Sequence, residues 1–297
     1  DCSETMADAG LVDIRALVPD IDQDIKYAGS DNFVGRPVDG YDAPRCMLAV
    51  DAAAALARVE EALRGDGYRL RLFDCYRPAR AVADFVRWAA DVSDQATKPA
   101  HYPALDKSQL LGEYIAPVSG HSRGRTVDLT LLQCDHAGSC RELDMGTPFD
   151  FFDPRANTDS PAATPVQRAN RQRLLAAMQA EGFRNYPMEW WHFTLQQEAS
   201  PPVNQHPVHD VPVTADAHNR PGAIAALMQR YEGDGPGASL LVLKDGEAVV
   251  RRGYGLSDLE RGIEAGPGTN YRLASVSKQF TAAAILLLQQ DGKLSID

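Results

Sequence analysis

Long hydrophobic runs are missing from this chain of 297 residues. Its longest apolar stretch, Ala282–Leu288, falls far short of the ~18 residues that a membrane-spanning helix requires, so we expect no membrane span. Positive charge is also scarce, because 30 Lys and Arg residues stand against 41 Asp and Glu residues and give a net charge of −11. Nucleic acids and anionic membranes bind to basic faces, so this balance argues against both as partners.

The cysteines include no Cys-x2-Cys pair, which argues against a zinc site built from four cysteines. Cys134 and Cys140 flank a short polar loop, whereas Cys46 precedes a predicted helix and Cys75 ends the strand after that helix. Two disulfides formed by these pairs, with Cys2 left over, suit an oxidising compartment and predict a periplasmic or secreted protein. The alternative is a cytoplasmic enzyme with five reduced thiols, and the sequence alone does not fix the connectivity.

The length of the chain suggests about two domains. Residues 199–222 are rich in Pro and Val, show no amphipathic period and read as a Pro-rich linker between residues 1–198 and 223–297. The linker carries three histidines, which we expect to be solvated rather than bound to a metal: His206, His209 and His218. The first residue is Asp1 and no signal-like segment follows, so we expect that a leader was removed or that the chain was trimmed.

Helical and strand patterns alternate irregularly in the first 198 residues. Hydrophobic periodicity predicts helices over Ala52–Arg64, with Asp51 as the cap, over Pro78 to about Ala90 and over about Pro165–Glu181. Strand patterns cover Arg69–Phe73, Thr126–Leu132 and Trp190–Leu195. There is no strict β-α-β repeat, so the expected fold is α+β, with a small, mostly antiparallel sheet and flanking helices that carry a metal site.

Two separated motifs supply metal-binding side chains. Ser119 to Asp128 is a polar, glycine-containing turn that leads into a strand and holds His121 and Asp128, and Glu189-Trp190-Trp191-His192 follows downstream. Two imidazoles and one carboxylate match the three protein ligands of a catalytic zinc, and the spare Glu189 suits a general base. Glu189 and His192 would point to opposite faces of an extended strand, so we expect a bend near Pro187.

His-x-x-Gly-x-x-x-Asp followed by Glu-Trp-Trp-His-Phe resembles the signature of the zinc D-alanyl-D-alanine dipeptidases. Residues 26–37 and Asp74-Cys75-Tyr76-Arg77-Pro78 match the same family, and the resemblance covers about residues 11–198. It implies one Zn²⁺ per chain, held by His121, Asp128 and His192. It also implies roles for four further residues: Glu189 as the base, Arg77 at the oxyanion, Asp144 at the substrate ammonium and Ser119 at the substrate carboxylate.

Two of these residues have an alternative structural interpretation, in which Glu189 orients a ligand histidine and Arg77 pairs with Asp74. We expect Trp190, Trp191 and Phe193 to contribute packing rather than substrate contacts.

The last part of the chain carries a different pattern. A hairpin is predicted over Ala238–Val250 with Asp245-Gly246 at its turn, and a helix over Tyr271 to about Gln290. Ser275-x-x-Lys278 lies at the start of that helix and resembles the start of the penicillin-binding, class C β-lactamase-like serine hydrolases. The later motifs of such a site are missing, so we expect no serine-hydrolase activity and a longer natural protein.

These patterns predict a zinc metallopeptidase that cleaves D-alanyl-D-alanine to two D-alanines. The alternatives are a zinc D,D-carboxypeptidase acting on longer wall peptides, a non-catalytic wall-binding module and a chain whose activity lies in the serine-hydrolase part. The presence of Glu189 and Arg77 argues against a mere binding module. If the loop Asp135–Ser160, which contains Asp144, folds over the site, it excludes longer peptides. The sequence carries no signal for an oligomeric state.

Overall fold

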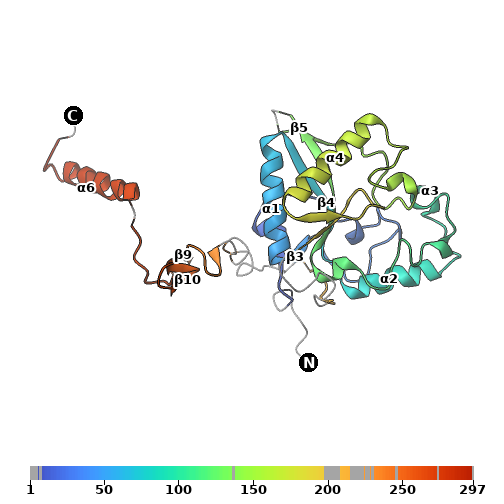
Figure 1. Cartoon of the computed structure of the whole chain (residues 1–297), viewed down its shortest axis with the longest axis horizontal. Coiled ribbons are helices and arrows are strands. Elements are labelled where there is room, and N and C mark those ends of the chain that lie inside the picture. The colour runs from blue at the N-terminus through green and yellow to red at the C-terminus, as the bar shows by residue number, and fades with distance from the viewer. Residues whose placement is uncertain are drawn as a thin grey trace, which may run out of the picture. The chain divides into compact units, whose positions relative to one another are not determined.

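The chain divides into two units, Asp1–Gln229 and Arg230–Asp297, which we describe separately (Figure 1). The structure is a computed structural model that describes these residues: 6, 9–135, 138–196, 208–214, 224, 228, 231–244, 247–272 and 274–295. No helix among them is both long and apolar enough to cross a membrane.

A mixed sheet forms the centre of the first unit. Its strands lie in the order β2 (Asp22–Gln23), β4 (Tyr68–Asp74), β5 (Thr126–Cys134), β8 (His192–Leu195) and β7 (Phe183–Asn185). A sixth strand, β6 (Cys140–Glu142), pairs with the far end of β5. Only the β2–β4 pair is parallel, which agrees with the expected small and mostly antiparallel sheet. Seven consecutive residues of β5 are buried, as is typical of a strand that is covered on both faces.

Two helices cover the sheet side by side (Figure 1): α1 (Val50–Gly65) and α4 (Pro165–Ala180). α4 begins with the reciprocal hydrogen bonds of a capping box between Thr164 and Gln167. The expected cap of α1 is wrong, because Ala49 occupies the N-cap without a side-chain bond. Asp51 lies instead in the first turn, where its charge complements the helix dipole.

The remaining elements of the first unit lie around this core. They are β1 (Leu11–Asp13) with its antiparallel partner β3 (Met47–Ala49), and the helices α2 (Ala79–Ala90) and α3 (Lys98–His101). Short 3₁₀ helices cover Ile14–Ala16, Lys26–Ala28, Lys107–Gln109, Gly120–Arg123 and Pro154–Ala156. The element order is mixed and consistent with the expected α+β class.

Two disulfides tie the first unit together. The structure joins Cys46 to Cys75 and Cys134 to Cys140, the two pairs that the sequence suggested. Cys46 and Cys75 are fully buried beside β4, whereas Cys140 is exposed on the β5–β6 hairpin.

Residues 208–214, which we call the strap, pack on the first unit although they fall inside the expected linker. The Val213 N–H donates to Gly40 O at 2.9 Å, and the Val211 N–H donates to Tyr76 Oη at 2.9 Å. Asp210 forms an ion pair with Arg80 at the start of α2. His209 is bound through its backbone, as a donor to Ser122 O and an acceptor from the Ala79 N–H. His206 and His218 lie outside the described residues.

The second unit contains the expected hairpin. Its strands are β9 (Ala238–Lys244) and β10 (Glu247–Tyr254), while the expected Asp245-Gly246 turn lies outside the described residues. A second strand pair, β11 (Leu256–Asp258) and β12 (Ile263–Glu264), precedes a 3₁₀ turn at Ala274–Ser277 and the helix α6 (Lys278–Gln290). Large apolar side chains on β9 and α6 are exposed in this unit: Leu241, Leu243, Ile285, Leu286, Leu287 and Leu288.

Candidate active site

Three acidic or imidazole side chains lie in one row across the central sheet. The strand register places Asp74 of β4 opposite Asp128 of β5, and Asp128 opposite His192 of β8. Residues directly opposite one another on adjacent strands project their side chains to the same face within ~5 Å. The sheet itself therefore brings residues together that are far apart in the sequence.

His121 joins this row from a short 3₁₀ helix, Gly120–Arg123, immediately before β5. Ser119 caps the helix by accepting a hydrogen bond from the His121 N–H, and Gly124 ends it in the left-handed conformation with φ of 73°. A side chain at position 124 would collide with Leu11 and the backbone of Ala49. The glycine of His-x-x-Gly is therefore required to turn the chain back into β5.

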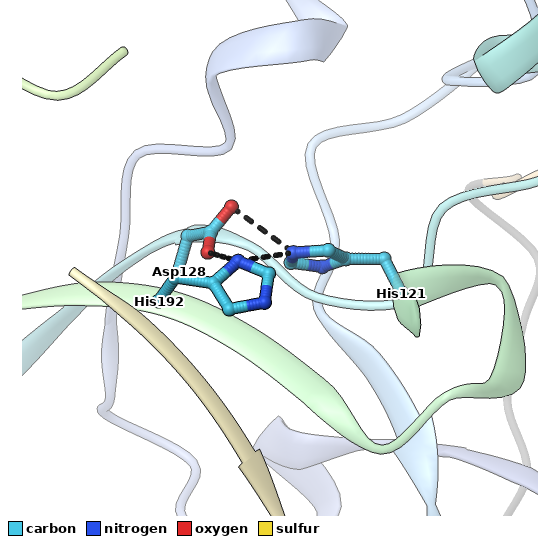
Figure 2. A group of neighbouring side chains, drawn as sticks. All are labelled: His121, Asp128 and His192. Atoms are coloured by element: carbon cyan, nitrogen blue, oxygen red, sulfur yellow. Dashed lines mark hydrogen bonds and ion pairs between the residues drawn. The ribbon is translucent and has the colours of Figure 1, made fainter. Parts of the chain in front are cut away.

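The three expected metal ligands meet at one point (Figure 2). Asp128 Oδ2 lies 3.2 Å from His121 Nε2, and Asp128 Oδ1 lies 3.0 Å from His192 Nδ1. The two ring nitrogens are 3.4 Å apart, and the ligand atoms of all three residues lie within 4.8 Å of one another. Three N and O donors of this kind are the protein ligands that a catalytic zinc site uses.

A hydrogen bond to the backbone determines the tautomer of His121, and so which ring nitrogen carries a lone pair. Its Nδ1 lies 2.7 Å from Cys75 O, and since a carbonyl only accepts, Nδ1 carries the hydrogen. In the neutral ring Nε2 then directs a lone pair toward Asp128 and His192. Asp128 Oδ1 is buried and has no partner of hydrogen-bond geometry. A lone pair of His121 and the oxygens of a buried carboxylate that meet at one point fit a bound cation.

The ionisation of Asp128 is consistent with a metal ligand. Burial acts to raise the pKa of Asp128, but the imidazoles of His121 and His192 outweigh it and lower the pKa below its ordinary value. Burial likewise acts to lower the pKa of His192, and the Asp128 carboxylate more than offsets it. Asp128 is therefore held as the anion that a metal ligand must be.

Glu189 reaches the same centre from a turn. The Glu189 N–H donates to Tyr186 O and the His192 N–H donates to Glu189 O, so the chain bends just before β8, as the sequence predicted. Glu189 Oε2 lies 3.5 Å from His192 Nδ1. Burial raises the pKa of Glu189 to about 7, although the nearby His192 opposes the shift. A carboxyl group with a pKa near neutrality suits a group that accepts and returns a proton.

Arg77 lies beside the ligands and is held by a buried carboxylate. Its Nε and Nη2 donate to Asp74 Oδ2 at 3.0 and 2.8 Å, and Nη2 lies 3.6 Å from Asp128 Oδ2. The guanidinium also lies over the rings of Tyr27 and Phe85, 5.1 and 4.9 Å from their centroids. The pairing with Asp74 that the sequence left open is present, and it holds Arg77 in a fixed position facing the site.

A cavity of about 260 Å³ opens onto these groups. It is lined by all three expected ligands and by Glu189, Arg77 and Ser119, together with Tyr27, Asp150 and Trp191. Much of the remaining wall comes from residues 112–116 and 118–120, a loop whose role the sequence did not indicate. Trp190 and Phe193 are buried packing residues, and Trp191, although buried, forms part of the cavity wall.

Asp144 is not among the residues that line this cavity. Its carboxylate accepts hydrogen bonds from the Gly146 N–H and from Gln167 Nε2. From the same loop the structure instead places Asp150 in the wall, where Asp150 Oδ2 accepts from Tyr27 Oη at 2.8 Å. The sequence did not single out Asp150, although its partner Tyr27 lies within the segment 26–37 that carried the family resemblance.

Ser275 and Lys278 belong to the second unit. Ser275 lies in the 3₁₀ turn before α6 and Lys278 begins that helix. Both side chains are exposed, and the structure, which describes both residues, records no hydrogen bond between them. The serine–lysine pair is thus present in sequence and placed one helical turn apart, without a formed contact.

Comparisons with known proteins match each unit separately. The profile of a family described as D-ala-D-ala dipeptidase matches residues 7–213, and that of the beta-lactamase family matches residues 222–297. The D-alanyl-D-alanine dipeptidase of Enterococcus faecium is 38% identical over 193 residues, which cover 65% of this chain and 94% of the relative. The D-alanyl-D-alanine dipeptidase of Streptomyces coelicolor is 43% identical over 189 residues, which cover 63% of this chain and 92% of the relative.

The second unit has its own relatives. Protein flp of Staphylococcus aureus is 44% identical over 62 residues, which make up 21% of this chain and 12% of that protein.

Proposed function

This chain belongs to the D-alanyl-D-alanine dipeptidase family, and we propose that its first unit hydrolyses the dipeptide D-alanyl-D-alanine to two D-alanines with one zinc ion. The observation that carries the proposal is the meeting of His121, Asp128 and His192 with Glu189 in one cavity. A module that only binds the cell wall needs neither Glu189 nor Arg77 beside the metal ligands, and both line this cavity.

Zinc held by these three side chains would supply a Lewis acid and an activated water at the scissile peptide bond. Glu189 would accept a proton from the attacking water molecule and return it to the leaving amine. Arg77 presents a rigid cation where negative charge develops on the scissile carbonyl oxygen. Its bonds to Asp74 keep the guanidinium oriented, so little reorganisation is needed during the reaction.

The two charged ends of a free dipeptide need partners in the same cavity. Asp150, supported by Tyr27, supplies a buried carboxylate for the ammonium, and Ser119 supplies a hydroxyl for the carboxylate. A volume of about 260 Å³ lies below the ~300–1,000 Å³ that is usual for drug-sized ligands. A cavity of this size has room for a dipeptide, and the buried Asp150 in its wall favours a free amino end over the longer wall peptides of a D,D-carboxypeptidase.

The compartment is proposed from the disulfides. Cys46–Cys75 and Cys134–Cys140 are both formed, and disulfides persist in oxidising surroundings. This supports a periplasmic or secreted enzyme.

The test measures D-alanine released from D-alanyl-D-alanine by the whole chain, after metal removal with a chelator and again after return of Zn²⁺. We expect release only with the metal present. Glu189→Gln should keep one zinc per chain and lower kcat by ~10²–10⁴-fold, the range for a positioned acid–base group.

Glu61→Gln is the matched control, because Glu61 is an exposed carboxylate of α1 that does not line the cavity. Its kcat should stay within a few-fold of the wild type. Full activity of the metal-free chain, or a loss below tenfold in Glu189→Gln, would refute the proposed mechanism.

A further inference from the structure

We propose that His101 is a positioning residue that fixes Asp150 in the conformation needed to recognise the free amino end of the substrate. The proposal rests on the function proposed above. His101 does not line the cavity, so it acts on the substrate only through Asp150.

The backbone of Asp150 adopts a conformation that needs support. Its φ is 56°, in the left-handed region that residues other than glycine rarely occupy. Such a conformation persists only where the surroundings determine it, and it is found where function requires a particular side-chain direction. In this conformation the buried carboxylate of Asp150 reaches both the cavity and Tyr27 Oη.

His101 binds the chain on both sides of residue 151, which follows Asp150. The His101 Nδ1 lies 2.9 Å from Asp150 O, and the Phe152 N–H donates to His101 O at 2.8 Å. One residue at the end of α3 thus satisfies the carbonyl of residue 150 and the amide of residue 152. This double contact holds the chain immediately after Asp150, the residue with the positive φ. It therefore restricts relaxation of the backbone at this point.

The ring of His101 is a hydrogen-bond donor at this point. Burial lowers the pKa of His101 below its ordinary value, so the ring is neutral at pH 7 and carries one hydrogen. Because a carbonyl oxygen only accepts, that hydrogen is on Nδ1. Loss of the donor would leave the carbonyl of Asp150 without this partner.

Aromatic packing holds the neighbouring residues independently of His101. Phe149 packs against Trp191, and Phe152 packs against Phe33 and Tyr114. These contacts anchor the loop at both ends, while the peptide between them carries Asp150. Removing the His101 donor is therefore expected to change the direction of one carboxylate rather than to unfold the loop.

The experiment compares His101→Leu with His101→Asn in the whole zinc-loaded chain. Both substitutions fill part of the imidazole's space, but only Asn offers an N–H near the position of Nδ1. Rates are measured on D-alanyl-D-alanine and on its N-acetyl derivative, which has no ammonium. Lys98→Ala, in the same short helix, controls for a general loosening of α3.

We expect His101→Leu to keep one zinc per chain and to lower kcat/KM for the free dipeptide by about 10- to 100-fold, mainly through KM, as for a small misplacement of a binding group. The preference for the free over the acetylated substrate should shrink. His101→Asn should restore most of the preference, and Lys98→Ala should retain it.

An equal loss on both substrates in His101→Leu, or a His101→Asn variant no better than His101→Leu, would overturn the proposal. If His101→Leu does not fold, the ¹⁵N spectrum of the wild-type ring decides: a ring with its hydrogen on Nε2 at pH 7 refutes the proposed contact. A wild-type chain that releases no D-alanine would instead refute the proposed function, whatever the variants do.

Discussion

Asp128 and Asp150 are buried in the wall of one cavity, yet their surroundings shift their pKa values in opposite directions. Two imidazoles lower the pKa of Asp128 against the effect of burial, so that it stays ionised. Burial raises the pKa of Asp150 well above its usual range, and the hydrogen bond from Tyr27 opposes this only in part. A cation that pairs with a buried carboxyl group of this kind favours its ionised form, and this is the role that we propose for the substrate ammonium.

Asp150→Asn should therefore damage recognition of the free dipeptide selectively. We expect kcat/KM for D-alanyl-D-alanine to fall by about 100-fold or more, because an ammonium left unpaired in a buried site is costly. Activity on N-acetylated D-alanyl-D-alanine should change little, and zinc content should stay at one per chain.

Asp144→Asn makes the same chemical change in the same loop and serves as the matched control. Its carboxylate bonds to Gln167 and to the Gly146 N–H, outside the cavity, so its kcat/KM should stay within a few-fold of the wild type. If Asp144→Asn is the more damaged of the two, the ammonium partner is Asp144, as the sequence resemblance implied.

At the scale of elements, hydrophobic periodicity along the sequence predicted the positions of helices and strands. The helix predicted over Pro165–Glu181 ends within a residue of α4, and the predicted strand Arg69–Phe73 lies inside β4. The bend before His192 followed from side-chain direction alone. What no local pattern contains is strand register, which sets Asp74, Asp128 and His192 in one row.

For the same reason, the sequence does not distinguish which of Asp144 and Asp150 lines the cavity. Both are aspartates in one polar loop, and the neighbouring sequence does not distinguish them. They are distinguished by a positive φ at Asp150 and by a hydrogen bond from Tyr27, which is 123 residues away in the chain. Long-range contacts of this kind decide which carboxylate enters the cavity, and they leave no mark on local composition.

The Cys46–Cys75 disulfide holds the chain at the end of β4, where three groups lie at or next to the site. Cys75 O accepts the hydrogen bond that orients His121, and its neighbours Asp74 and Arg77 lie at the site. The Cys134–Cys140 disulfide closes a hairpin six residues beyond Asp128, about 20 Å along β5. The two disulfides should therefore differ in their effect on the metal.

Replacing Cys46 and Cys75 together by Ala should weaken zinc binding by about 10- to 100-fold, the usual effect of losing a group that orients a ligand. Replacing Cys134 and Cys140 together should leave the affinity within a few-fold of the wild type. Competition with a chelator, at a temperature where both variants are folded, measures the difference. Equal affinities in the two double variants would show that the Cys75 carbonyl keeps its position without the disulfide.

At the scale of the whole molecule, the composition of residues 199–222 and the contacts of the strap indicate different ends for the first unit. The Val-Pro steps and histidines of residues 199–222 are typical of a linker, but composition does not report whether a segment finds a partner. In the strap, Val211 and Val213 are buried, and Asp210 forms an ion pair with Arg80. The dipeptidase family profile also extends to residue 213. We therefore propose that the strap is part of the first unit.

Val213→Ala should then destabilise the first unit. Val213 is fully buried among Leu11, Met47 and Tyr76, and removing its methyl groups is expected to cost ~1–3 kcal/mol in the free energy of unfolding. Val208→Ala is the matched control, because Val208 belongs to the same strap and is 40% exposed.

All three tryptophans of the chain, Trp88, Trp190 and Trp191, lie in the first unit, so their fluorescence during denaturant unfolding reports on that unit alone. If the strap packs on the first unit, Val213→Ala should unfold at a lower denaturant concentration than Val208→Ala. Identical midpoints would mean that residues 208–214 contribute nothing to the fold and form a linker after all.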